Sequence, residues 1–118
     1  MATITKRQLS GSTDGLSIAI AATATPGTTL HTGATATGTI DEIWLYVFNT
    51  ATADRQVTIE WGGVATSNTI IDTITAQDGL WKMADGLNLG GAATALIIRA
   101  FATATGGINA QGYVNRIA

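Results

Sequence analysis

Few side chains in this sequence could do chemistry, and its single histidine, His31, is the natural place to begin. A general base or a metal ligand needs partners at suitable spacing, and the chain has no cysteine that could supply a thiolate. A serine nucleophile would need a turn of the G-x-S-x-G type, which the sequence lacks. We therefore expect His31 to be a surface or loop residue, and we predict no catalytic residue, no metal site and no cofactor.

The carboxylates fit turns and solvated faces better than they fit a reactive site. Asp78-Gly79 and Asp85-Gly86 are separated by mostly apolar residues rather than by the alternating oxygen ligands of a calcium loop, so both pairs are predicted to be turns. Asp41 and Glu42 are adjacent, and neighbours on a strand point to opposite faces. Neither is therefore expected to form the carboxylate pair of a glycosidase with Glu60, and we predict that all three are solvated.

Composition excludes several classes of function. The net charge is -2, which argues against a nucleic-acid partner. No apolar run approaches the roughly 18–20 residues of a membrane span, and no apolar segment follows Lys6-Arg7 as in a signal peptide, so neither a membrane nor secretion is expected. Charged residues make up only 12% of the chain, about half the usual share. We expect part of this weakly charged surface to be covered by protein partners.

The rest of the chain is organised around residues 41–63, which we interpret as a hairpin of two strands joined by a polar loop. Apolar residues occupy both alternating faces of 43–48, so this strand must be covered on both sides. Residues 56–61 alternate between apolar side chains and polar ones such as Thr58 and Glu60, which predicts one wet face. A central strand that is apolar on both faces, beside a strand that is apolar on only one face, is typical of a β-sandwich.

Glycine-rich turns separate the other predicted strands, and almost no segment shows helical periodicity. This pattern predicts an all-β protein, a single-domain antiparallel β-sandwich or jelly roll with an extended N-terminal arm. We place the arm at 1–14 and the sandwich domain at 15–118. The expected strands outside the central pair are 16–20, 28–32, 70–74, two short pieces on either side of a turn at 85–86, 94–102 and 108–117.

The arm is expected to be ordered only against a partner. It carries Ile4 and Leu9 but no neighbouring apolar residues that would bury them. Lys6 and Arg7 are too few for a nucleic-acid surface and suit one or two acidic contacts on a protein. We therefore predict that Ile4, Lys6, Arg7 and Leu9 contact a protein partner.

The aromatic residues of the central strand indicate a second contact surface. In a two-layer sandwich only one face of each sheet is internal, so Trp44, Tyr46 and Phe48 need cover from elsewhere. We predict that they form the interface of a homo-oligomer, either a dimer or a trimer. The alternative is an aromatic platform for sugar rings, formed together with Trp61 and Trp81.

Four segments of the later chain are VTIEWGG (57–63), ADGLNL (84–89), TALIIRAFA (94–102) and GYVNRI (112–117). Together they resemble the small structural proteins of tailed bacteriophages that serve as capsid decoration, or cement, proteins. The resemblance implies a β-sandwich or jelly roll that binds the major capsid protein on the virion exterior, as a symmetric oligomer made in the bacterial cytoplasm. It implies no catalytic residue and no small-molecule substrate.

A different class of function remains open for the same fold. A phage fibre module, or another receptor- or carbohydrate-binding module, would use the sandwich with its aromatic residues as the recognition surface. An enzyme is the least favoured class, because no reactive constellation accompanies His31. The order of the genes around this reading frame, or detection of the protein in purified virions, is the observation that would narrow its function most.

Overall fold

The computed structural model describes residues 2–118 and consists of strands, turns and one short 3-10 helix. Within these residues no helix is long and apolar enough to cross a membrane. The strands are β1 (Ile4–Gln8), β2 (Ile18–Ala19), β3 (Thr28–Thr32), β4 (Ile40–Asn49), β5 (Arg55–Trp61), β6 (Thr69–Ile74), β7 (Trp81–Gly90), β8 (Ile97–Ala102) and β9 (Ile108–Ile117), and the 3-10 helix η1 (Thr66–Asn68) precedes β6.

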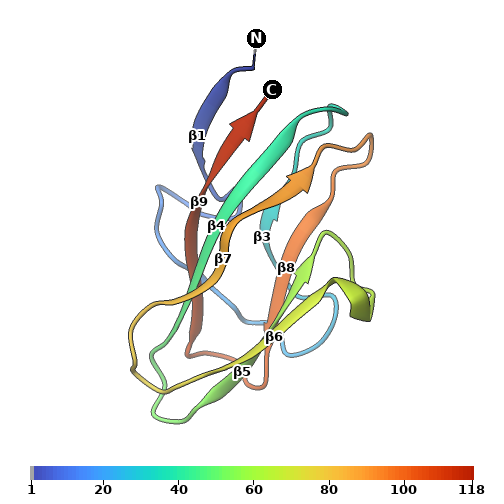
Figure 1. Ribbon diagram of the computed structural model, residues 1–118. Helices are drawn as coiled ribbons and strands as arrows, with labels where there is room; N and C mark the ends of the chain where they lie inside the picture. Colours follow the sequence, from blue (N-terminus) through green and yellow to red (C-terminus); the bar gives the residue numbers. More distant parts are fainter. Residues whose placement is uncertain (1) are drawn as a thin grey trace.

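Two antiparallel sheets pack face to face (Figure 1). Sheet A has the order β1-β9-β4-β7, with the short β2 pairing with β9, and sheet B has the order β3-β8-β5-β6. The prediction of an all-β sandwich is confirmed. The predicted strands 28–32 and 108–117 have the same bounds in the structure, whereas only Ile18–Ala19 of the expected strand 16–20 is paired in a sheet.

The core lies between the sheets and follows the alternation of side chains along each strand. In β4 the odd-numbered residues Ile43, Leu45 and Val47 point inward and are almost completely buried, while the even-numbered aromatic residues point outward. Inward residues of the other strands complete the core, namely Leu30, Val57, Ile59, Ile74, Ala84, Leu89, Ile98, Ala100, Ala102, Ile108, Ala110 and Val114.

The predicted hairpin of β4 and β5 is wrong. β4 lies in sheet A between β9 and β7, whereas β5 lies in sheet B between β8 and β6, so the chain between Asn49 and Arg55 crosses from one sheet to the other. A strand that is apolar on both faces needs two strand neighbours and cover above and below. Those neighbours come from distant parts of the chain, which the local pattern could not indicate.

The predicted wet face of β5 is also wrong. Thr58 and Glu60 are buried, because the segment that precedes β3 lies against them. The Glu60 carboxylate accepts a hydrogen bond from the Gly27 backbone N–H at 2.7 Å and another from the Thr25 hydroxyl. A buried carboxylate needs such donors, and this loop supplies them.

The N-terminal segment is a strand of sheet A rather than a free arm. β1 pairs antiparallel with β9 from Ile4↔Ile117 to Gln8↔Tyr113. Leu9 follows the strand directly and is 1% exposed within the core, so the expectation that it lacks local burial is wrong. Ile4 is 67% exposed, and the adjacent Thr3 backbone N–H donates to the Ala118 carbonyl at 2.7 Å, so β1 begins beside the C-terminus (Figure 1).

The expected turn at Asp85-Gly86 is a bulge within one continuous strand. β7 runs from Trp81 to Gly90, and its register with β4 shifts twice, between Ile43 and Trp44 and between Leu45 and Tyr46. Gly86 has a φ of +73°, which L side chains rarely adopt. The Asp-Gly pair therefore bends the strand without ending it.

Candidate functional site

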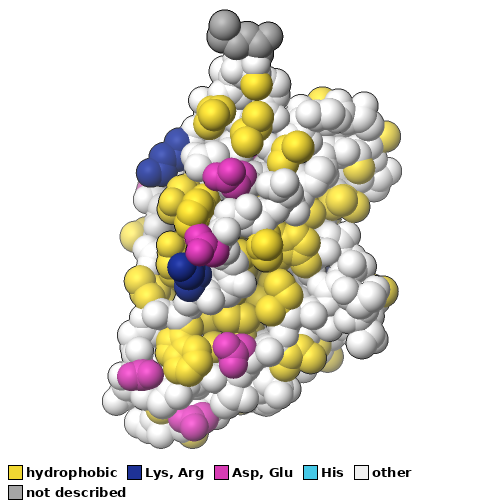
Figure 2. Space-filling model, viewed as in Figure 1, with side chains coloured by type: hydrophobic (Ala, Val, Ile, Leu, Met, Phe, Trp, Pro, Cys, Tyr) yellow, Lys and Arg dark blue, Asp and Glu magenta, His cyan; other side chains and the backbone are white. Residues whose placement is uncertain are grey.

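The outer face of sheet A carries the largest group of aromatic side chains outside the core. The register places the outward residues of neighbouring strands side by side: Tyr113 beside Trp44, Gln111 beside Tyr46, and Asn109 beside Phe48. Trp44, Tyr46 and Phe48 are half-buried. Figure 2 shows hydrophobic side chains gathered along the region of β4 and β7, with single charged side chains between them.

A row of contacts crosses β1, β9, β4 and β7 on this face. The rings of Trp44 and Tyr113 are nearly parallel, 8° apart in plane, with centroids 5.8 Å apart. The Lys6 ammonium lies 4.6 Å from the centroid of the Tyr113 ring, a cation–π contact. At the other end, a Cβ on Gly86 would lie 3.3 Å from Cζ2 of Trp44, so the glycine backbone lies against that ring.

The stack holds the aromatic residues in fixed positions. The Trp44 indole N–H donates to Glu42 at 3.3 Å, and the Asn115 amide donates to the same carboxylate oxygen at 3.3 Å. The contacts with Lys6, Tyr113 and Gly86 leave little of the Trp44 and Tyr113 ring faces free for a sugar ring. Such a surface suits a partner that packs across ring edges and aliphatic atoms, as proteins do.

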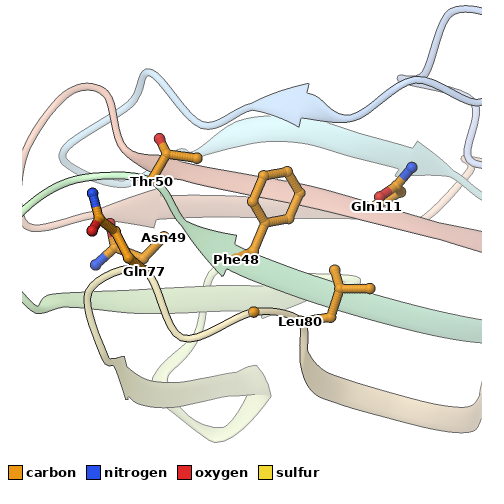
Figure 3. A pocket seen from close by; sticks show the side chains of 7 residues that line it. Phe48, Asn49, Thr50, Gln77, Leu80 and Gln111 are labelled. Carbon is orange, nitrogen blue, oxygen red and sulfur yellow. The ribbon is translucent and has the colours of Figure 1, made fainter.

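A cavity of about 540 Å³ lies at the end of this face, beside Phe48. Phe48 stands in the middle of the lining residues, with Leu80 and Gln111 to one side and Thr50 and Gln77 to the other (Figure 3). Leu80 is 61% exposed beside Phe48 and adds apolar surface to the rim of the cavity. The cavity extends the apolar part of the outer face beyond β4.

The structure brings together the predicted interface residues and part of the predicted arm. Lys6 joins the outer face through Tyr113, whereas Ile4 lies at the tip and Leu9 in the core. The sequence analysis missed Tyr113 and Leu80. The alternation of β9 could have placed Tyr113 on the outer face, but pairing with β4 was needed to place it beside Trp44.

A second cluster, of His31, Asp41 and Arg116, lies between the sheets, with His31 and Asp41 buried and Arg116 partly exposed. The Arg116 guanidinium donates to both Asp41 carboxylate oxygens, at 2.7 and 2.8 Å, and His31 Nε2 lies 2.8 Å from Asp41 Oδ2. His31 is 2% exposed and Asp41 is 0% exposed, so the predictions that His31 lies at the surface and that Asp41 is solvated are wrong. Each group gives the others a hydrogen-bond partner, and these hydrogen bonds offset the desolvation cost of burying them.

The hydrogen bonds of His31 define its tautomer. The Ser10 backbone N–H donates to Nδ1 at 3.1 Å, so Nδ1 carries no proton and Nε2 donates to Asp41. The Ser10 hydroxyl in turn accepts from the Thr32 backbone N–H at 2.6 Å. Both imidazole nitrogens are thus engaged, and neither contacts the Ser10 hydroxyl. The cluster joins β3, β4 and β9 to the segment after β1, and it is arranged for structure rather than for nucleophilic catalysis.

Burial and the neighbouring charges shift the pKa values of all three side chains. Burial lowers the pKa of His31 below its ordinary value near 6.5, and the hydrogen bond to Asp41 opposes that shift only in part, while Arg116 and Arg7 add to it. Burial would raise the pKa of Asp41, but hydrogen bonds from Arg116 and His31 outweigh this effect and lower it below its usual value. Arg116 has a raised pKa because it donates to Asp41.

Stability should fall on mild acidification because of His31. Its pKa is lower in the folded chain, so the unfolded chain takes up a proton first as the pH falls below about 6.5, and folding stability decreases from there down to the folded pKa. Protonation would also turn Nδ1 into a donor facing the Ser10 N–H. Urea denaturation at several pH values from 8 to 5 measures the effect, with a slope of at most about 1.4 kcal/mol per pH unit for one proton.

The control for this prediction is His31→Gln. His31 is the only histidine, and no other side chain type ordinarily titrates between pH 5 and 7. The variant is expected to be less stable at every pH but to show a flatter profile in this range. An equally steep profile in the variant would show that another group is responsible. Asp41 adds a separate loss of stability below its ordinary pKa of about 4.

Comparison of the chain with protein-family models, with curated protein sequences and with solved structures gave no match. Among residues 2–118 no three histidine, cysteine or carboxylate side chains are grouped as a metal site would require. The function is therefore inferred from the two clusters and the surfaces around them. Of these, the outer face of sheet A is the candidate functional site.

Proposed function

We propose that this chain is a non-enzymatic structural protein of a virus particle, which attaches to the exterior of a tailed-phage capsid and stabilises it by bridging capsomers. The observation that carries the proposal is the outer face of sheet A. Its aromatic side chains are fixed by the Lys6–Tyr113–Trp44 stack and are only half-buried in the single chain. Such a face is suited to contact with a second copy of the chain, and the resulting oligomer would present several capsid-binding surfaces at once.

The resemblance to decoration proteins supports the same proposal. Its segments 57–63, 84–89, 94–102 and 112–117 correspond largely to β5, β7, β8 and β9, which contribute to both sheets. The segments that carry the resemblance therefore form strands of the sandwich itself rather than loops on its surface. The major capsid protein is the proposed partner, and the capsid exterior in the virion is the proposed location.

Many copies on one particle make weak contacts effective. A decoration protein that contacts neighbouring capsomers gains from the high effective concentration of its second contact once the first has formed. Ile4 alternates with Lys6 on β1 and pairs with Ile117, the partner of Ile40, so it extends the same outer face. Bridging therefore depends on the oligomer, in which each copy contributes one capsid-binding surface.

The test is binding to empty capsids assembled from the major capsid protein encoded in the same genome. The purified chain is expected to cosediment with the capsids to a saturating ratio and to raise the temperature at which they disrupt. Tyr46→Lys should reduce binding at least tenfold, because it places a charge in the outer face and dissociates the oligomer whose copies bind the capsid together. Gln56→Lys, an exposed position on the other sheet, is the matched control. Failure of the wild-type chain to cosediment would refute the proposal.

A carbohydrate- or receptor-binding module of a phage fibre is the second candidate. The cavity beside Phe48 favours it, because an aromatic ring flanked by the amides of Gln77 and Gln111 is suitable for a neutral sugar. The stacked contacts of Trp44 and Tyr113 count against a sugar platform on the rest of the face. Glycan binding that is abolished by Phe48→Ala would favour this candidate over capsid attachment.

A further inference from the structure

A second hollow in the described chain lies on the opposite side of β1 from the aromatic stack, and its lining is polar and basic. It has a volume of about 610 Å³ and is formed by β1, the turn that follows it, β3 and the end of β9. We call it the β1 groove. Its lining includes Lys6, Arg7, Ser10, Ser12, Thr32 and Arg116.

Arg116 is a preorganised cation in the β1 groove. Two hydrogen bonds to Asp41 fix its guanidinium, and Asp41 is itself held by His31. The Arg116 side chain nevertheless remains 21% exposed. Nε and Nη2 are the nitrogens bonded to Asp41, so Nη1 has no hydrogen-bond partner among residues 2–118. An arginine fixed on one side and open on the other is well placed to bind a further anion.

Arg7 adds a charge that no carboxylate in the described chain neutralises. Arg7 pairs with Val114 and Thr5 pairs with Arg116, so Arg7 and Arg116 are diagonal neighbours on the same face of the sheet. Among residues 2–118 neither Arg7 nor Lys6 lies within 4.0 Å of a carboxylate, and Asp41 is the only carboxylate that pairs with Arg116. The groove thus collects two cations, Arg7 and Arg116, around one buried anion, because the Lys6 ammonium lies on the opposite face over Tyr113.

We propose that the β1 groove binds a carboxylate-bearing, extended segment of a partner protein. This inference rests on the proposed function, in which the segment belongs to the capsid surface. A carboxylate can bridge Arg7 and the open side of Arg116, which both line the groove. β1 pairs with β9 on one side only, so its other edge can pair with the backbone of an extended segment.

The chemistry favours an acidic polypeptide over a nucleic acid. A nucleic-acid strand needs a track of cations along its phosphates, whereas only Arg7 and Arg116 present their charges to the β1 groove of a chain with a net charge of -2. A short segment with one or two carboxylates matches both the number of charges and the open strand edge.

The direct test uses a labelled eight-residue peptide of alternating Glu and Thr, titrated with the purified chain at low salt and followed by fluorescence anisotropy. We expect saturable binding that weakens with salt, falls roughly tenfold in Arg7→Gln, and is unchanged in Arg99→Gln, which alters an arginine on a strand of sheet B. The same peptide with Gln in place of Glu should bind at least tenfold more weakly. Equal binding of both peptides, or an equal loss in the two variants, would overturn the proposal. So would tighter binding of a single-stranded DNA 12-mer.

Capsid cosedimentation separates this inference from the proposed function. If the wild-type chain binds capsids and Arg7→Gln binds equally well, the groove inference is wrong and the proposed function stands. If the acidic peptide binds through Arg7 but the chain does not bind capsids, the carboxylate site stands and the proposed function is wrong. Reduced capsid binding by Arg7→Gln together with normal binding by Arg99→Gln would support both.

Discussion

Replacement of Asp41 by alanine is expected to lower the free energy of unfolding by about 3–5 kcal/mol, a large fraction of the stability of a domain of this size. Asp41 is 0% exposed and accepts hydrogen bonds from His31 on β3 and Arg116 on β9. β3 belongs to sheet B and β9 to sheet A, so this one carboxylate connects the two layers. Its removal leaves a half-buried guanidinium without its counter-ion and an imidazole without its acceptor.

The control is Asp85→Ala, which removes a carboxylate from an ion pair at the surface of the same sheet. Asp85 pairs with Lys82 at 3.0 Å, and both side chains are about half exposed, so little change in stability is expected. Urea denaturation at pH 7, followed by tryptophan fluorescence, measures both variants. An Asp41→Ala variant as stable as Asp85→Ala would show that the buried cluster contributes little to folding.

The fold class could be predicted because it depends on local alternation. The alternation of Ile43, Leu45 and Val47 predicts a strand whatever its neighbours in the sheet are. Glycine-rich segments predict where strands end. Bounds such as 28–32 and 108–117 followed from the same pattern. Information of this kind is confined to a window of a few residues.

The partners of each strand could not be predicted in the same way. β4 and β5 are consecutive and both apolar, which favours a hairpin, yet they belong to different sheets. The choice depends on which distant strands cover both faces of β4, and β9, one of its neighbours, begins about sixty residues after it ends. The alternation of polar and apolar residues in β5 likewise could not show that the Glu60 carboxylate accepts a hydrogen bond from the loop at Gly27.

The buried cluster escaped prediction for a related reason. His31, Asp41 and Arg116 have no motif spacing, and 75 positions separate Asp41 from Arg116. Only the antiparallel pairing of β4 with β9 places Asp41 directly opposite Arg116. The sequence alone therefore does not indicate whether a lone histidine in a threonine-rich segment is exposed or buried. In the structure His31 is one of the most completely buried polar side chains among residues 2–118.

Tyr46→Lys is expected to convert a homo-oligomer of the wild-type chain, a dimer or a trimer, into monomers. Tyr46 lies in the middle of the outer face, between Gln111 of β9 and Lys82 of β7, with Trp44 and Phe48 two residues to either side on the same strand. A lysine there would place a second positive charge beside Lys82 and would require an ammonium to be desolvated in any contact through this face.

The size of the outer face explains why the effect should be large. Its aromatic residues, with the exposed Leu80 and the Ile40 at the opposite end, can form a patch of several hundred Å². At about 25 cal/mol per Å², burial of such a patch contributes several kcal/mol, enough to drive association after the entropy of binding is subtracted. The loss of that burial in the variant corresponds to a weakening of association by a factor of one hundred or more.

Multi-angle light scattering of the purified chain at micromolar concentration measures the oligomer directly. Gln56→Lys introduces a lysine on sheet B and should have the same oligomeric mass as the wild-type chain. Tyr46→Lys should have the mass of one chain. Unchanged circular dichroism of the variant establishes that its fold is intact, because position 46 faces away from the core. A wild-type chain that is monomeric under these conditions would reject the interface, and an oligomer that persists in Tyr46→Lys would place it on another surface of the sandwich.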